Sequence, residues 1–219
     1  GRQGRKGETV ALIIQDEATS WVQGYGCKTK SAEETKKCFE YFMGTTMKAK
    51  LVYTDNSQEL TSALEMLGWP HDPSTPYKPQ TNGIAERAVR RVKEGTSCML
   101  VQSGFCEFWW PKAMQLYCLY RCVIDVLVGG ETAYMKRYGV EFTGPIIPMG
   151  ARVQYKPLDP RDKAKIDKYS SKVLEGIFVG HEQHHGGKCT TNLLIINAEE
   201  LEEASTASKV NIKRIPRGN

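Results

Sequence analysis

Apolar residues in the first 126 positions follow two alternating patterns. A continuous apolar run predicts a β-strand at residues 10–14, residues 21–27 are predicted to be its hairpin partner, and residues 49–54 are predicted to be the next strand. Apolar positions at helical spacing predict helices, which cover residues 31–42, 59–67, 83–101 and 110–126. Strands that alternate with helices are typical of an α/β sheet protein, in which ligand sites gather at the carboxyl ends of strands.

The pattern changes after residue 126. A short helix is predicted at residues 132–138, and the glycines on both sides of it mark a linker. Short strand signals then follow at residues 153–155, 176–179, 193–196 and 210–212, which favours a small, partly closed β-barrel. The sequence therefore predicts an α/β core at 1–126, a linker at 127–147 and a C-terminal β domain at 148–219.

Composition limits the class of protein only broadly. The 219 residues suffice for one large and one small domain, and apolar (40%) and charged (25%) contents are ordinary for a soluble protein. The net charge of +5 is compatible with nucleic acid without being specific for it. The seven cysteines include no Cys-x-x-Cys pair, which favours free thiols in a reducing compartment. With no membrane-length apolar run and no signal-peptide pattern, we expect a soluble intracellular protein.

Two acidic residues occupy positions that are typical of a metal site. Asp55 directly follows the apolar strand that ends at Thr54, and Glu86 lies one turn inside the helix that opens after Asn82 and Gly83. Carboxylates on rigid elements are ligands for magnesium or manganese, which such sites hold against phosphate groups. The alternative is that Asp55 caps a turn and that Glu86 is an ordinary solvated helix residue.

The segments around these carboxylates resemble the catalytic segments of retroviral-type integrases, most closely those of copia-type retrotransposons. Residues 55–60 match the second segment, and residues 77–87 match the third through its Pro-Gln-x-Asn-Gly-x-x-Glu pattern. The resemblance covers nearly the whole chain, and weaker supporting matches lie at residues 16–21, 104–113 and 176–180. It implies a ribonuclease H-like mixed sheet flanked by helices and followed by a small β-barrel-like region.

The resemblance also implies an activity. An intact enzyme of this family is a polynucleotidyl transferase that trims the 3′ ends of element DNA and joins them to target DNA. Asp55 and Glu86 would be its catalytic residues and its ligands for Mg²⁺ or Mn²⁺. We expect DNA as the partner, a homo-oligomer as the acting form, the nucleus as its place of action, and no small-molecule substrate.

The family pattern needs a third carboxylate, and the chain departs from it there. The relatives carry this Asp on a strand before the one at 10–14, whereas residues 1–8 contain no Asp, so we expect the chain to start after it. Asp16 matches a turn residue of the relatives that binds no metal. The interval from Asp55 to Glu86 contains 30 residues, shorter than is usual for the family. A catalytically dead relic that binds nucleic acid or acts as a scaffold is therefore the alternative function, and another ribonuclease H-like nuclease is a third.

Basic residues accompany Glu86 along its helix. Helical geometry places Glu86, Arg90 and Lys93 on one face, and Arg87 lies beside them. The opposite, buried side is predicted to consist of Ala85, Ala88, Val89 and Val92. The resemblance implies that Arg87, Arg90 and Lys93 contact DNA phosphates, together with Tyr77, Gln80 and Asn82 of the preceding loop. The alternatives are a Glu86–Arg90 ion pair on an exposed helix and a simple turn at Asn82.

Three other features have simpler explanations. The segment containing His181, His184, His185 and Cys189 does not fit common structural-zinc spacing and is predicted to be a Gly-rich hairpin between two strands. The aromatic residues of 109–120 are expected in the core or in a subunit contact. The charged stretch 161–172 is expected to be a solvated linker, with DNA contact as its alternative.

Overall fold

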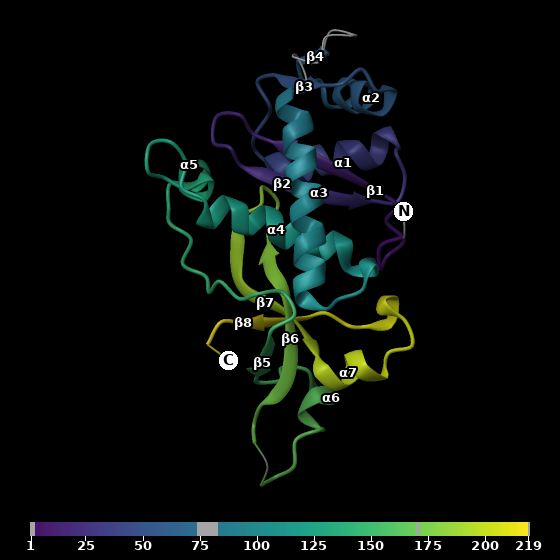
Figure 1. Cartoon of the computed structure of the whole chain (residues 1–219), viewed down its shortest axis with the longest axis vertical. Coiled ribbons are helices and arrows are strands. Elements are labelled where there is room, and N and C mark those ends of the chain that lie inside the picture. The colour runs from purple at the N-terminus through teal and green to yellow at the C-terminus, as the bar shows by residue number, and fades with distance from the viewer. Residues whose placement is uncertain (1–2, 74–82, 170, 219) are drawn as a thin grey trace.

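The computed structural model describes residues 3–73, 83–169 and 171–218 (Figure 1). Its N-terminal half begins with the strands β1 (Val10–Gln15) and β2 (Val22–Cys27), which pair antiparallel. Two helices and two short strands then alternate: α1 (Ala32–Met43), β3 (Val52–Thr54), α2 (Gln58–Leu67) and β4 (His71–Pro73). The strands β3 and β4 pair in parallel, and within the described residues neither sheet has a further strand.

Local signals explain where the first helices begin and end. Ser31 caps α1 by accepting a hydrogen bond from the backbone N–H of Glu34, and Ser31-Ala-Glu-Glu34 has the sequence of a capping box. In a standard capping box the Glu34 carboxylate would accept a hydrogen bond from the backbone N–H of Ser31. Here it accepts from the backbone N–H of Thr29, two residues earlier, at 2.7 Å. Gly68 ends α2 in the left-handed conformation at φ 62°, which glycine adopts without strain.

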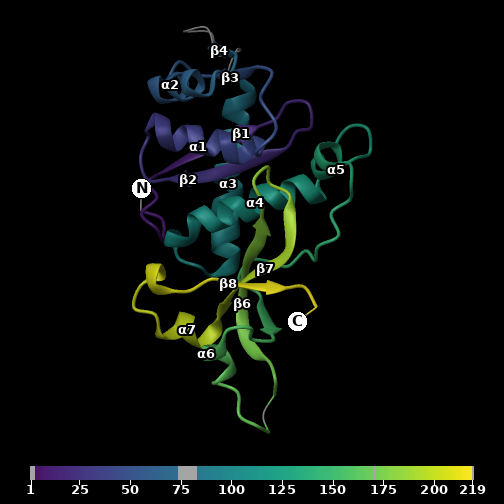
Figure 2. The same ribbon diagram turned by 180° about the vertical axis from the view of Figure 1, so that it is seen from behind.

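Three helices follow; α3 and α4 lie at the centre of the molecule and α5 lies at its side (Figure 2). They are the long helix α3 (Gly83–Ser103), the core helix α4 (Trp110–Ile124), which a short 3₁₀ turn at Glu107–Trp109 precedes, and α5 (Ala133–Tyr138). The helices α3 and α4 approach closely at Gly95, where an added Cβ would lie 2.0 Å from the Tyr117 ring. None of the helices in the described ranges is long and apolar enough to cross a membrane.

The C-terminal part is a four-stranded antiparallel sheet in the order β5-β6-β7-β8. The strands are β5 (Arg152–Tyr155), β6 (Leu174–Gln183), β7 (Cys189–Asn197) and β8 (Lys213–Pro216). The short helices α6 (Pro160–Lys163) and α7 (Ala198–Glu203) and a 3₁₀ turn at Ala207–Lys209 lie in the connections. Lys213 on β8 contacts Asp162 at 2.6 Å and Glu200 at 2.9 Å, which ties both short helices to the sheet.

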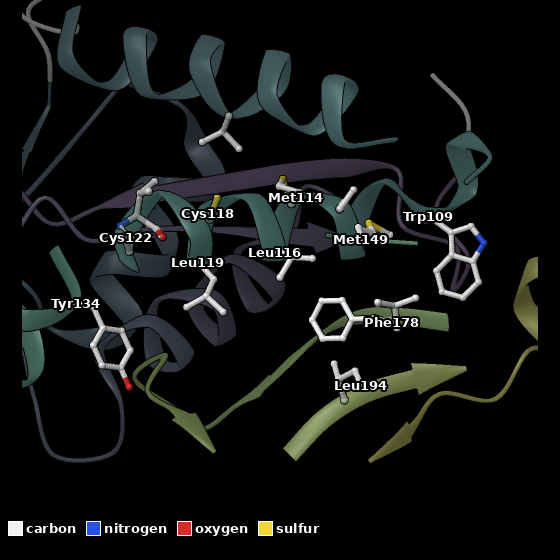
Figure 3. Packing of buried hydrophobic residues seen from close by; sticks show 14 of the residues in the cluster. Trp109, Met114, Leu116, Cys118, Leu119, Cys122, Tyr134, Met149, Phe178 and Leu194 are labelled. Atoms are coloured by element: carbon white, nitrogen blue, oxygen red, sulfur yellow. Dashed lines mark hydrogen bonds between the residues drawn. The ribbon is translucent and has the colours of Figure 1, made fainter. Parts of the chain in front are cut away.

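One hydrophobic core joins the two halves of the chain. Met114 on α4 packs against β2 at Gly24, where an added Cβ would lie 2.6 Å from the Met114 side chain. Leu116 and Leu119 on the same helix point toward the C-terminal sheet, whose Phe178 and Leu194 belong to the same core (Figure 3). Because α4 is covered on two sides, most of its apolar residues are buried, and Trp109 just before it is 1% exposed. Its aromatic residues Trp110, Tyr117 and Tyr120 are partly buried and pack against the same core.

Two arginines with buried side chains make polar contacts across this core. The Arg5 guanidinium lies over the Trp109 ring, 4.9 Å from its centroid, and also donates to the Ala207 carbonyl at 3.3 Å. The Arg137 guanidinium lies 4.7 Å from the Phe42 ring centroid and donates to the Phe42 carbonyl at 2.6 Å. Each contact combines cation–π attraction with a hydrogen bond and joins segments that are distant in sequence.

The predicted α/β class and the small C-terminal β region are confirmed, while the domain boundaries remain a prediction. Two element predictions were wrong. The strand expected at 210–212 lies at Lys213–Pro216, because Val210 is buried in the core instead of pairing in the sheet. The composition of residues 70–82, rich in Pro, Ser and Thr, predicts a loop, yet His71–Pro73 forms β4 by pairing with β3.

Replacing Phe178 by Ala tests the shared core. The side chain is fully buried between α4 and the C-terminal sheet, so its loss should reduce the free energy of unfolding by about 3–5 kcal/mol. Urea unfolding followed by both tryptophan fluorescence and circular dichroism measures this loss. The control Val128→Ala, at a fully exposed side chain, should change stability by less than about 0.5 kcal/mol. Two separate transitions in the wild-type chain would contradict a single core.

Candidate metal and nucleic-acid site

Asp55 lies immediately after β3, at the start of the turn that leads into α2. The buried Thr54 holds this strand end in place, because its hydroxyl lies 2.7 Å from His71 Nε2 on β4. Asp55 is exposed, and its Oδ1 accepts a hydrogen bond from the backbone N–H of Ser57 at 3.2 Å. The turn-capping interpretation is therefore correct, but it occupies only one carboxylate oxygen; the described contacts include none to Oδ2. Asp55 thus keeps an oxygen that faces solvent and can bind a cation.

Glu86 lies in the first turn of α3 and is exposed. A negative charge at a helix start is favoured by the helix dipole, which needs no ion pair. Among the described ion pairs, none joins Glu86 to Arg90, so the expected alternative of an i,i+4 pair is not formed. The Glu86 carboxylate is therefore available to an external ligand.

The exposed face of α3 is basic. Arg87, Arg90 and Lys93 are all exposed, and the last two line an open depression together with Glu94, Ser97 and Cys98. The buried stripe of the helix is narrower than predicted and consists of Ala88, Val92 and Thr96. Ala85 and Val89 were wrongly assigned to it: both are exposed, because the first turns of α3 extend beyond the core. This leaves more of the helix free for a partner.

The start of α3 and the strands β3 and β4 lie at the same end of the molecule in Figure 1 and Figure 2. The elements that carry Asp55 and Glu86 therefore share one end of the fold. Tyr77, Gln80 and Asn82, the predicted DNA-contacting loop residues, lie outside the described residues. Within the described ranges, no group of three or more His, Cys, Asp or Glu side chains is placed to hold a metal ion. Among the described residues, no third acidic side chain therefore completes a metal site with Asp55 and Glu86.

Asp16 has a structural role, as the turn interpretation predicts. Its carboxylate accepts a hydrogen bond from the Thr19 hydroxyl within the turn between β1 and β2. Arg137, whose side chain is 7% exposed, lies 3.9 Å from the same carboxylate oxygen. Both described contacts of Asp16 therefore hold the turn and link it to the helix α5, as expected of a turn residue.

The histidine-rich segment forms the predicted glycine-containing hairpin between β6 and β7. The His184 N–H donates to the Lys188 carbonyl at 2.9 Å and so closes the turn. The His185 ring stacks on Tyr41 of α1, with 4.0 Å between the ring centroids. His181 is instead buried among aromatic rings, and burial lowers its pKa to about 4, with the charge of Arg217 adding to the effect. These contacts explain the histidines without a metal.

His71 is a site residue that sequence analysis missed. Its ring fixes Thr54, the residue before Asp55, although it lies in a segment whose prolines and polar residues indicate a loop. A histidine in such a segment has no periodic signal that would place it in a strand. Only the parallel pairing of β3 and β4 brings it to the strand end.

Comparison with known proteins finds a similar sequence in a retrotransposon polyprotein. It is 25% identical, over 178 residues, to the "Retrovirus-related Pol polyprotein from transposon RE1" of Arabidopsis thaliana, covering 78% of this chain and 12% of the polyprotein. The chain is therefore similar to a short part of a retrotransposon Pol polyprotein. It spans about an eighth of that relative's length. This confirms the predicted retroelement relationship, and its copia-type subdivision remains a prediction. No family model matches the chain.

Solved structures with a similar arrangement come from retroviral integrases. One is the catalytic core domain of BIV integrase, with a TM-score of 0.43 and 20% identity, covering 57% of this chain and 82% of that one. Another is the simian T-cell lymphotropic virus intasome in complex with PP2A regulatory subunit B56 gamma. Its TM-score is 0.49 at 16% identity, and the match covers 94% of this chain and 69% of the matched chain.

Burial of His181 predicts a pH dependence of stability. Its folded-state pKa of about 4 lies below the unfolded value of about 6.5, so the unfolded state binds more protons between these values. The contribution is fully present above pH 6.5 and is lost as the pH falls toward 4, by roughly 3 kcal/mol in total. Urea unfolding at pH 7, 6 and 5 should show this slope, and His181→Gln should flatten it. An NMR titration that gives His181 a pKa near 6.5 would contradict the prediction.

Proposed function

We propose that this chain is part of a retrotransposon integrase that acts in the nucleus on element ends and target DNA. The observation that carries the proposal is the placement of Asp55 at a strand end and Glu86 at a helix start, within a Pol polyprotein homologue. The proposed reaction is 3′-end processing followed by strand transfer. In the first step water attacks a DNA phosphorus, and in the second the new 3′ hydroxyl attacks a phosphorus of the target DNA. In each step the bond from that phosphorus to a 3′ oxygen breaks, and this oxygen leaves.

The two carboxylates fit a hard divalent cation. Asp55 has an oxygen without a described partner, Glu86 has no described ion pair, and both are exposed. Magnesium is commonly held by one or two carboxylates, with waters and substrate phosphates completing the shell. Asp55 and Glu86 would hold Mg²⁺ or Mn²⁺, which when bound would neutralise charge that develops on the phosphate. A third carboxylate, which the integrase resemblance implies, is proposed to come from outside the described residues.

The chain's own cations have a separate role in the proposal. Arg87, Arg90 and Lys93 lie on exposed turns of α3 next to Glu86, where a DNA backbone must pass to bring a phosphate to the carboxylates. Phosphate contacts of this kind position DNA without selecting its sequence. We therefore propose that α3 orients the DNA, that the carboxylates act on it, and that the acting form is an oligomer.

A second candidate function is a catalytically inactive nucleic-acid-binding or scaffold protein. The observation that favours it is the lack, in the described ranges, of a third acidic residue near the pair. The two candidates share the basic face of α3 and differ in the chemistry at the carboxylates. Sequencing the reading frame upstream for an Asp-bearing strand distinguishes them directly.

Loss of either carboxylate should abolish strand transfer. In a longer stretch of the reading frame that includes the upstream strand, Asp55→Asn and Glu86→Gln should each reduce joining of labelled element ends by at least about 100-fold, since each removes a charged metal ligand. Glu94→Gln, two turns further along α3, is the matched control and should retain activity. Wild-type activity in Asp55→Asn or Glu86→Gln would remove the site assignment, and cleavage of RNA–DNA hybrids without joining would favour the nuclease alternative.

Removing the α3 cations should weaken DNA binding whether or not the enzyme is active. Arg90→Ala combined with Lys93→Ala should lower affinity for duplex DNA and reduce the slope of log affinity against log salt by about 2, because two phosphate contacts are lost. Fluorescence anisotropy at several salt concentrations measures both quantities. The control, Lys36→Ala with Lys37→Ala, removes the same charge from α1. An equal change in slope for this control would assign the effect to net charge alone.

A further inference from the structure

Cys27 and Cys38 lie side by side on two different elements. Cys27 is the last residue of β2, and Cys38 lies in the second turn of α1. Their Sγ atoms are 3.5 Å apart and share a hydrogen bond. A disulfide bond is about 2.05 Å long, so the sulfurs need to approach by only about 1.5 Å to bond. Side-chain rotation in a pair already in contact supplies such a movement.

The environment makes one member of the pair the nucleophile. The hydrogen bond from the Cys38 thiol lowers the pKa of Cys27, against the opposing effects of burial and of the Glu34 carboxylate. The same hydrogen bond and burial raise the pKa of Cys38. Cys27 is buried, but Cys38 is partly exposed beside it and leaves a path for a small oxidant. The thiolate, not the thiol, reacts with such oxidants.

The other cysteines lack this combination. Cys118 and Cys122 are buried in the core, and burial raises the pKa of both thiols, that of Cys122 to about 12. Cys98 and Cys106 are exposed, and no other thiol contacts them among the described residues. Cys189 is partly buried, and burial raises its pKa to about 12. Selective oxidation within one molecule is therefore expected only at the β2–α1 pair.

We propose that Cys27 and Cys38 form an oxidation site that closes to a disulfide when a hydroperoxide reacts with it. The Cys27 thiolate attacks one peroxide oxygen, which forms the S–O bond of a sulfenic acid, breaks the O–O bond and releases hydroxide, which is protonated to water. The Cys38 sulfur then attacks the Cys27 sulfur; the S–S bond forms, the S–O bond breaks, and the Cys38 proton leaves with the second water. The two sulfurs lose two electrons and hydrogen peroxide is reduced to two waters.

Closure would fix α1 to the β1–β2 hairpin. The cross-link encloses residues 28–37, so it restricts the unfolded chain and the movement of α1 in the folded one. Helix α1 packs against α2 through Phe39 and Leu64, and α2 begins at Gln58, close after Asp55. Oxidation therefore stiffens the segment that supports one of the candidate carboxylates. The proposal does not depend on the integrase assignment.

Peptide mapping tests the proposal. The full chain is treated with hydrogen peroxide under native conditions, alkylated and digested with trypsin without reduction. Residues 7–28 and 38–48 should appear as one cross-linked pair that dithiothreitol separates. The oxidised chain should melt about 5 °C higher than the reduced one. Cys38→Ser, a replacement at the partly exposed position, should lose both effects, whereas Cys98→Ser combined with Cys106→Ser should keep them.

Three outcomes would overturn the proposal. The first is a sulfinic or sulfonic acid at Cys27 without a cross-link, and the second is a cross-link from Cys27 to any other cysteine. The third is a Cys27–Cys38 cross-link that forms as fast in urea as under native conditions. The last would show that the native contact does not direct the reaction. Without peroxide, the Cys38→Ser chain should melt at the same temperature as the reduced wild type. This result verifies that the variant is folded.

Discussion

Burial of α4 on two opposite sides is the interaction on which the rest of the structure depends. Met114 of this helix meets the N-terminal hairpin, while Leu119 meets the C-terminal sheet. A helix covered on both sides is apolar around most of its circumference, which explains why its sequence has so few charges. Neither half of the chain can bury its own apolar face without this helix, so the folding of each half depends on the other.

The position of α3 follows from the same constraint. Its C-terminal half packs on α4, where Gly95 admits the Tyr117 ring, and its N-terminal turns extend past that contact. The extension is why Glu86 and the nearby cations remain exposed, and why Val89 does as well. A rigid helix anchored at one end can present charged groups without requiring those groups to stabilise it. The candidate site is thus supported by packing that lies elsewhere.

Much of this was predictable because the signals are local. Ser31 and Gly68 mark helix ends through hydrogen bonds and backbone conformations that neighbouring residues decide. Asp55 was placed correctly because the apolar run before it is a strand. The contribution of His71 was not predictable, since it arises when two distant segments pair. The same holds for the contact between Cys27 and Cys38, which depends on how α1 packs against the hairpin.

The edges of the two small N-terminal sheets have a practical consequence. In the described part of the chain, β1 pairs only with β2 and β3 pairs only with β4, so each keeps a row of backbone groups without a strand partner. Because β1 is almost wholly apolar, such an edge favours strand addition from another molecule and thus self-association at high concentration. The purified chain should therefore lose solubility as its concentration rises. Repulsion between the basic surfaces of two molecules opposes this self-association only at low ionic strength.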